Sequence, residues 1–211
     1  MDDETRRASQ HLAEQMRRIV ARLAVVRPPA EELHRAADAA ASFANHLDEL
    51  PERTTSWEIS EAGLQPRDFL AFSPVSGQAS PLAPPVRLRI VEADGDPPND
   101  YAVEGDATYG PQYEGPPGHV HGGMIAAMFD EMLGFAQLGP GFTAYLKIDY
   151  RRPTPLNRPL QLRAWVDRVD GRKRWIRGTS TLDGTLLAEA EGLFIAPKGD
   201  GDYLARLGMK V

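Results

Sequence analysis

The sequence predicts an α+β fold in which one antiparallel β-sheet wraps around a central apolar helix, with a helical extension at the N-terminus. Three observations support this class. Apolar residues recur at helical spacing in the first 50 residues, residues 118–138 form a single apolar helix, and short alternating strands flank that helix. A helix this apolar cannot face water on any side, so the simplest architecture places it inside the curve of the sheet.

Residues 1–50 are predicted to form the N-terminal helical extension, made of two helices. Pro28 and Pro29 separate the two apolar runs, because proline ends one helix and can open the next. Residues 51–85 are rich in proline and lack periodicity, which indicates an extended connector.

Residues 86–197 are predicted to form the main domain, and residues 198–211 a C-terminal tail. Asp170-Gly171 and Asp183-Gly184 are strong signals for tight turns, so the last three strands are expected to form hairpins. These turns predict an antiparallel meander, and the order of the elements is two strands, the helix and four strands. The strands are expected over residues 86–92, 101–108, 143–150, 160–169, 172–182 and 185–196.

Composition excludes several classes of protein. The 211 residues, 42% of them hydrophobic, are enough for a substantial core. No apolar run approaches the roughly 18 residues of a membrane span and no signal peptide is seen, so a cytoplasmic protein is expected. Zero cysteines exclude disulfides, a cysteine nucleophile and thiolate metal ligands. The net charge of −6 argues against nucleic acid as a partner.

The charge is unevenly distributed along the chain. Residues 1–140 contain 11 Lys and Arg against 22 Asp and Glu, whereas residues 141–211 contain 13 against 8. Much of the basic excess lies in residues 150–158 and 168–177. These arginines either meet a phosphorylated ligand or form the solvated faces of surface strands, and the sequence leaves both readings open.

The apolar helix has two stripes on a helical wheel. Asp130 lies in the middle of a stripe of small residues, and Glu131 lies about 100° away, at the boundary between the stripes. A buried carboxylate without a partner costs several kcal/mol, roughly, so Asp130 is either paired with an arginine at a surface or used in chemistry. The small stripe holds Gly123, Ala126, Ala127, Asp130, Gly134 and Gln137, and the bulky stripe Ile125, Met128, Phe129, Met132 and Leu133.

The start of this helix is a second polar feature. His121 precedes Gly122 and Gly123, where the free N–H groups of the first turn and the helix dipole can polarise a carbonyl oxygen. Asp130 lies about 12 Å further along the axis, at ~1.5 Å per residue. One substrate can contact both the helix start and Asp130 in only two ways. Either it lies along the small stripe, or a second chain supplies one of the two groups. The spacing therefore favours a shared, dimeric site.

Other chemistries find less support. His119 and His121 have the alternate spacing of metal ligands, but no acidic ligand follows at a suitable distance, so no metal is expected. A serine triad is disfavoured because the G-x-S-x-G elbow is absent. No phosphate-binding loop or dinucleotide fingerprint predicts a nucleotide cofactor.

The stretch "GPPGHVHGGMIAAMFDEMLG" with "TAYLKIDYRRPTPL" resembles the hotdog-fold acyl-CoA thioesterases, specifically the phenylacetate-degradation-type branch. The shared pattern is His-Gly-Gly, an acidic residue nine positions after the histidine, and a strand ending in Y-x-R-P-x-P-L. The resemblance covers about residues 72–197. It implies the hotdog fold, hydrolysis of an acyl-CoA thioester, no cofactor beyond the CoA of the substrate, and a homodimer or a dimer of dimers with interfacial active sites.

The resemblance also implies roles for individual residues. Asp130 would be the general base or the nucleophile, and the N–H of Gly122 or Gly123 would polarise the thioester carbonyl. The remaining roles are loop shaping and thioester contact by His121, orientation of the water or carboxylate by Thr143, and CoA phosphate binding by Arg151 and Arg152. A non-catalytic acyl-CoA or lipid-binding regulator is the alternative. The acyl group, aliphatic or aromatic, is left open.

Overall fold

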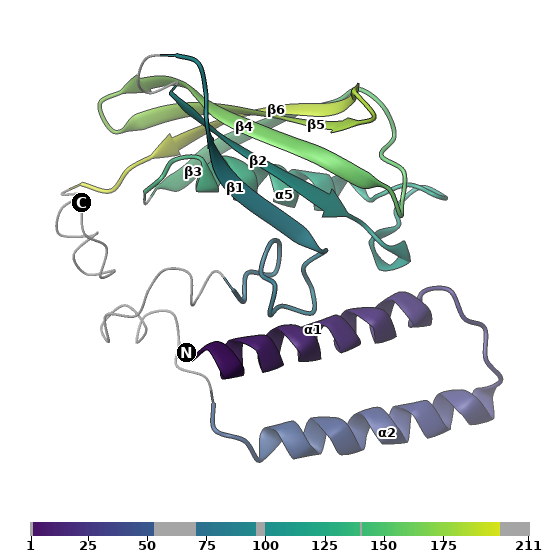
Figure 1. Ribbon diagram of the computed structural model, residues 1–211. Coiled ribbons are helices and arrows are strands. Elements are labelled where there is room, and N and C mark those ends of the chain that lie inside the picture. The colour runs from purple at the N-terminus through teal and green to yellow at the C-terminus, as the bar shows by residue number, and fades with distance from the viewer. Residues whose placement is uncertain (1, 53–70, 96–99, 140, 199–211) are drawn as a thin grey trace.

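The computed structural model describes residues 2–52, 71–95, 100–139 and 141–198. Two long helices come first, followed by two strands, a short 3-10 helix, the central helix and four more strands (Figure 1). The elements are α1 Asp3–Leu23, α2 Ala30–Asp48, β1 Val86–Glu92, β2 Tyr101–Thr108, η1 Pro111–Tyr113, α5 Gly122–Phe135, β3 Phe142–Tyr150, β4 Pro159–Asp170, β5 Lys173–Leu182 and β6 Thr185–Ile195.

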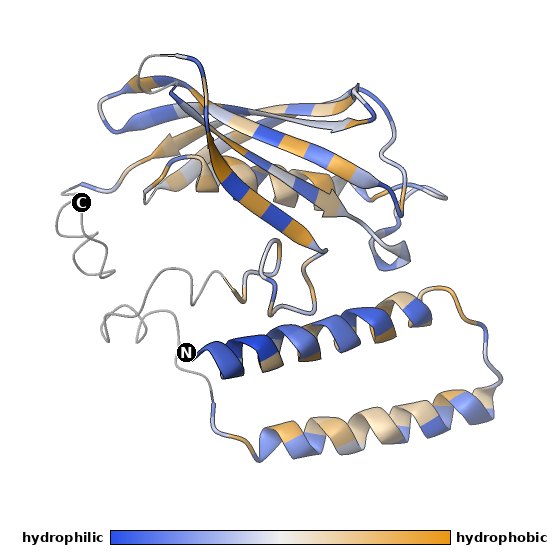
Figure 2. Cartoon of the chain, in the orientation of Figure 1, coloured by the Kyte–Doolittle hydropathy of each residue, from blue (hydrophilic) through white to orange (hydrophobic). Residues whose placement is uncertain are grey.

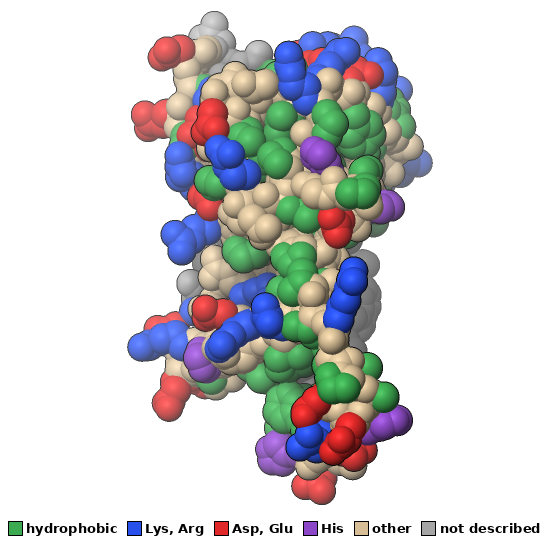
Figure 3. Space-filling view, turned by 90° about the vertical axis from the view of Figure 1, so that its right-hand side faces the viewer, with side chains coloured by type: hydrophobic (Ala, Val, Ile, Leu, Met, Phe, Trp, Pro, Cys, Tyr) green, Lys and Arg blue, Asp and Glu red, His purple; other side chains and the backbone are tan. Residues whose placement is uncertain are grey.

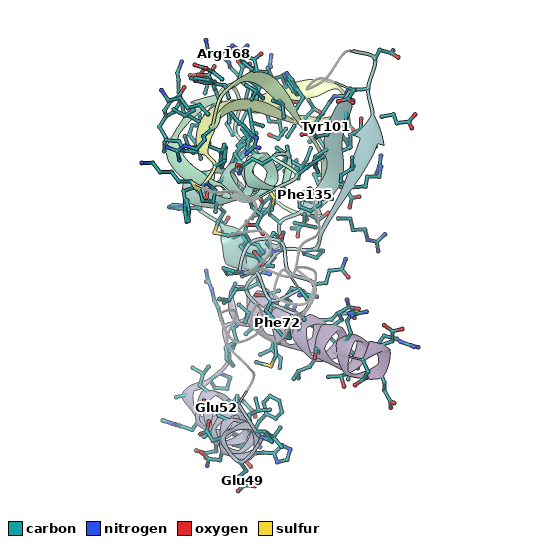
Figure 4. All side chains as sticks on the ribbon, turned by 90° about the vertical axis from the view of Figure 1, so that its left-hand side faces the viewer. Glu49, Glu52, Phe72, Tyr101, Phe135 and Arg168 are labelled. Carbon is teal, nitrogen blue, oxygen red and sulfur yellow. The ribbon has the colours of Figure 1, made fainter. Side chains whose placement is uncertain are left out.

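The six strands form one sheet in the order β1-β2-β4-β5-β6-β3, and every neighbouring pair is antiparallel. The sheet curves around α5, as the end-on view in Figure 4 shows. This arrangement confirms the predicted hotdog class and the predicted order of the elements. Strand β3 follows α5 directly in the chain but pairs with β6, which makes it an edge of the sheet.

The two predicted hairpin turns differ in detail. Between β5 and β6, Asp183 and Gly184 have φ angles of 49° and 77°, as expected for an Asp-Gly turn. Between β4 and β5, Asp170 still pairs with Lys173. The turn therefore consists of Gly171 and Arg172 rather than Asp170-Gly171, because glycine supplies the positive φ of 55° at the first turn position.

The core lies between α5 and the concave face of the sheet. All five residues of the predicted bulky stripe, from Ile125 to Leu133, are buried. Burying a side chain of this size stabilises the fold by about 1.5–3 kcal/mol. At the far end of α5, the Tyr101 hydroxyl donates a hydrogen bond of 2.8 Å to the Ala136 carbonyl. Tyr101 and Phe135 lie at this end of the helix in Figure 4.

The N-terminal region forms two helices, as the sequence predicts. The Asp2 carboxylate caps α1 by accepting the Thr5 N–H at 2.7 Å. α1 contacts the rest of the chain through the buried Ala13 and through Arg17, which donates to the Ser80 carbonyl at 2.7 Å. α2 lies on the far side of α1 from the sheet (Figures 1 and 4), and every one of its residues is exposed.

The predicted connector and tail are described only in part. Residues 71–85 run between α1 and the sheet without helix or strand, and the Tyr113 hydroxyl ties them to η1 through the Leu82 carbonyl at 2.9 Å. Residues 53–70 and 199–211 lie outside the described residues. None of the described helices combines the length and apolarity needed to cross a membrane.

Candidate active site

His121 caps the first turn of α5. Its ring Nδ1 accepts the Gly123 N–H at 3.0 Å, and its carbonyl accepts the Met124 N–H at 2.9 Å. Since Nδ1 is an acceptor, the ring proton lies on Nε2. The Gly122 N–H has no hydrogen-bond partner among the described residues. Of the two predicted donors, Gly122 is therefore the one that is free at the positive end of the helix dipole.

The loop before α5 is held from both sides. The His121 N–H donates to the Tyr113 carbonyl at 2.8 Å, and a Cβ at Gly115 would lie only 2.7 Å from the His121 Cα. Glycine at position 115 therefore permits this close approach. These contacts fix where α5 begins, and so fix which side chains lie on each of its faces.

Tyr150 also lies at the candidate site, although the sequence assigned it no role. Its hydroxyl, at the end of β3, donates to the Gly122 carbonyl at 2.8 Å, and the side chain is 55% exposed. The tyrosine begins the Y-x-R-P pattern noted in the sequence. Its position beside the helix start depends on the pairing of β3, which residue spacing does not reveal.

Asp130 and Thr143 lie together. The Thr143 hydroxyl donates to Asp130 Oδ1 at 2.8 Å, and this is the only hydrogen bond of the Asp130 side chain within the described part of the chain. Asp130 is exposed and forms no ion pair with a described arginine. The alternative of an arginine-paired surface carboxylate is therefore not what the structure shows. One carboxylate oxygen is held by a hydroxyl, and the other is free to accept a proton.

Glu131 has a different environment. It is partly buried, and its Oε1 accepts hydrogen bonds from the hydroxyls of Ser73, at 2.6 Å, and Ser76. Both serines belong to the connector, more than 50 residues earlier in the chain. The adjacent carboxylates thus point to different places: Glu131 anchors the connector, and Asp130 faces outward on the small stripe.

The small stripe is open for most of its length. Gly123 and Asp130 are exposed, Ala126, Ala127 and Gly134 are partly exposed, and only Gln137 is buried. The structure groups Asp130 with Thr143, and His121 with the two glycines and Tyr150. Asp130 lies eight positions after Gly122, which separates the two groups by about 12 Å along the helix. A single chain therefore does not bring them into contact with one reacting carbonyl.

The two candidate phosphate-binding arginines differ in their partners. Arg151 donates to Glu189 Oε1 at 2.8 and 2.5 Å and lies 3.6 Å from Asp149. The hydrogen bonds to Glu189 raise the pKa of Arg151 above its usual value. The only hydrogen bond of the Arg152 side chain to a described residue goes to the Leu186 carbonyl, at 3.3 Å. Among the described residues no carboxylate pairs with Arg152, so its charge is the more available of the two.

No group of three or more metal-ligating side chains occurs in the described part of the chain. His119, the other half of the His-x-His pair, donates from Nδ1 to the Pro117 carbonyl at 2.8 Å.

A small cavity of about 10 Å³ lies on the bulky side of α5. The Tyr109 and Ser180 hydroxyls line it without hydrogen-bond partners among the described residues. Its volume is that of about one water molecule.

Comparisons with known proteins identify the family. Residues 117–173 match the family model of the thioesterase superfamily. The chain is 40% identical over 88 residues to acyl-coenzyme A thioesterase THEM4 from Bos taurus, covering 41% of this chain and 37% of that protein. The THEM4 protein of Xenopus laevis is 40% identical over 91 residues, 41% of each chain. The match thus spans about two fifths of the length of these curated relatives.

A thioesterase superfamily protein of known crystal structure resembles almost the whole chain. The two are 35% identical, with a TM-score of 0.73, over 89% of this chain and 90% of the other. Residues 71–211 are only about two thirds of this chain, so the similarity extends into the N-terminal region. Sequence identity and fold agree over nearly the full length of both chains, and the protein belongs to the thioesterase superfamily.

Proposed function

We propose that the protein hydrolyses an acyl-CoA thioester to free CoA and a carboxylic acid. The observation that carries this proposal is Asp130, an outward-facing carboxylate on a helix of otherwise apolar and small residues, with one oxygen held by Thr143 at 2.8 Å. The matched relatives from Bos taurus and Xenopus laevis are named acyl-coenzyme A thioesterases, which supports the same substrate class.

The reaction needs a base and a site for the oxyanion. Water attacks the thioester carbonyl carbon while Asp130 removes its proton, and the carbonyl oxygen becomes negatively charged. The free Gly122 N–H, at the positive end of the helix dipole, donates to that oxygen. The carbon–sulfur bond then breaks, the acid is released, and the CoA sulfur takes up a proton. Asp130 can also attack the carbon directly, giving an anhydride that water hydrolyses.

Isotope labelling distinguishes these two routes. In a single turnover in ¹⁸O-labelled water, a general base directs the label straight into the carboxylic acid product. When Asp130 is the nucleophile and water attacks the aspartyl carbon of the anhydride, the label enters the Asp130 carboxylate and an unlabelled Asp130 oxygen leaves in the product. Mass spectrometry of the peptide that contains Asp130 reads out the difference.

The proposed active form is a homodimer in which one chain supplies the Asp130 group and its partner the Gly122 group. The 12 Å separation within one chain is the first support for this form. The second is β3, an edge strand of nine residues with exposed apolar side chains: Phe142 is 63% and Tyr145 41% exposed. Long apolar edges of this kind pair with another chain. Sedimentation at micromolar concentration tests this form, and a fully active monomer would contradict it.

Arg152 is proposed to bind a phosphate of CoA, since it has a free charge close to Tyr150 in the chain. Arg151 is expected to act mainly through its ion pair with Glu189, which orders the end of β3. Substitution of Arg152 is therefore expected to weaken substrate binding more than substitution of Arg151.

The decisive experiment measures thiol release from short, medium, long and aromatic acyl-CoA esters by the wild type, Asp130→Asn and Glu131→Gln. Asp130→Asn keeps the shape and the acceptor for Thr143 but removes the base, so kcat should fall by at least about 100-fold. Glu131→Gln is the matched control and should retain most activity. If folded wild type releases no thiol from any ester but still binds CoA esters, the chain is the non-catalytic binding protein of the alternative reading.

A further inference from the structure

The α1 and α2 helices, with residues 24–29 between them, form a helical arm that is poorly covered by the rest of the chain. Nine of the 16 large apolar side chains that are exposed in the described structure lie in residues 12–50. Figure 3 shows hydrophobic side chains gathered on this lower part of the molecule. An exposed apolar surface of this extent marks an interaction site.

α2 in particular requires a partner. All of its 19 residues are exposed, and no hydrogen bond or ion pair joins it to another described element. In proteins most helical stability comes from tertiary packing of an apolar face rather than from helix propensity. Its two ion pairs, from Arg35 to Glu31 and Glu32, are exposed and contribute little. The stability of α2 must therefore come from packing of its apolar face.

The apolar face of α2 is suited to another helix. Half of its residues are alanines, and small side chains allow two helix backbones to approach closely. In Figure 2 α2 shows many pale and orange turns, while α1 shows mainly blue ones. The face consists of Leu33, Ala37, Ala40, Phe43, Ala44 and Leu47.

The charges of the two helices are complementary. α1 has five arginines and three acidic residues, whereas α2 has one arginine and four acidic residues. Four large apolar side chains of α1 are 41–57% exposed: Leu12, Ile19, Val20 and Leu23. An acidic, alanine-rich helix and a basic, leucine-bearing helix form a matched pair, because both the apolar faces and the charges favour contact.

Within one chain this pair does not form. Residues 26–29, which include Pro28 and Pro29, connect the helices without helix or strand, and Pro29 has an extended backbone. α2 lies apart from α1 of the same chain (Figure 1), and every residue of its apolar face is exposed.

We propose that the arm binds the arm of a second copy of this chain, so that the acidic α2 of each copy packs on the basic α1 of the other in an antiparallel four-helix bundle. Four helices with short connections and inward apolar faces are a stable arrangement. The match of 89% of the chain to a solved relative includes much of this region, so the arm is not peculiar to this sequence. The proposal is independent of the catalytic activity proposed above.

The absence of native cysteines makes a direct test possible. Two differently tagged chains, one with Ile19→Cys and one with Ala40→Cys, are co-expressed and treated with a short flexible bismaleimide. Glu14→Cys with Asp38→Cys, on the polar faces of the same helices, is the control pair. Thiols held in one interface have effective concentrations in the millimolar range, so about tenfold more covalent heterodimer is expected from the apolar pair.

The double variant Ile19→Cys/Ala40→Cys in a single chain separates the alternatives. Cross-linked species of dimer mass support the proposal, and a monomer with an internal cross-link overturns it, since α2 would then fold onto its own α1. Equal yields from the apolar and control pairs would also overturn it. As a second measurement, Leu33→Asp/Leu47→Asp should abolish the cross-link between chains and lower the helical circular dichroism signal. An unchanged signal would show that α2 is stable without a partner helix.

Discussion

Substitutions of the two adjacent carboxylates of α5 are expected to have different effects: those at Asp130 lower activity, and those at Glu131 lower stability. Asp130 is exposed and accepts one hydrogen bond, which asparagine can still accept, so Asp130→Asn should change the free energy of unfolding by at most about 0.5 kcal/mol. Glu131 accepts two hydroxyl hydrogen bonds that hold the connector. Hydrogen bonds to charged groups contribute about 1.5–3 kcal/mol each when buried. Because the site is partly buried, Glu131→Ala should lose about 2–3 kcal/mol in total.

Urea unfolding followed by circular dichroism measures the stability, and thiol release from the best acyl-CoA ester measures the activity. Glu131→Gln retains an acceptor oxygen for the serines, so its stability loss should be about 1 kcal/mol with most activity kept. The reasoning is wrong if Glu131→Gln loses as much kcat as Asp130→Asn, because the base would then be Glu131. It is equally wrong if Asp130→Asn proves the more destabilising of the two.

Three further changes have defined expectations. Tyr101→Phe removes the bond to the buried Ala136 carbonyl and should lower the free energy of unfolding by about 1–2 kcal/mol in urea titration, with unchanged activity. Ser180→Ala deletes a buried hydroxyl that has no described partner, so stability should rise by up to about 1 kcal/mol; a loss instead would indicate a bound water in the cavity. Arg152→Gln should raise KM for acyl-CoA about tenfold while leaving kcat unchanged, whereas Arg151→Gln should mainly lower the melting temperature.

The strands and helices were predictable because their signals are local. Alternation over residues 86–92 and glycine or Asp-Gly turns mark strand ends directly in the sequence, and the structure places β1 and β2 on the predicted residues. The bulky stripe of α5 is likewise a consequence of the 3.6-residue repeat, and its five residues are the buried ones. Each of these features depends on residues within one element.

Contacts between elements far apart in the chain were not predictable. Ser73 and Ser76 reach Glu131 across more than 50 residues, and no spacing rule connects a proline-rich segment with a helix boundary. The position of β3 beside β6, which brings Tyr150 to Gly122, depends on the order of strands in the sheet. The separation of α1 and α2 was also missed, since helical periodicity predicts a helix but not its neighbour.

The cap of α5 determines which carboxylate becomes available for chemistry. Neighbouring residues on a helix point about 100° apart, so a shift of the helix start by one residue would rotate every side chain by that angle. His121 prevents such a shift, because its ring accepts the Gly123 N–H while its own N–H is bound to the Tyr113 carbonyl. The same cap leaves the Gly122 N–H free. One histidine thus sets both the donor at the helix start and, two turns later, the direction in which Asp130 points.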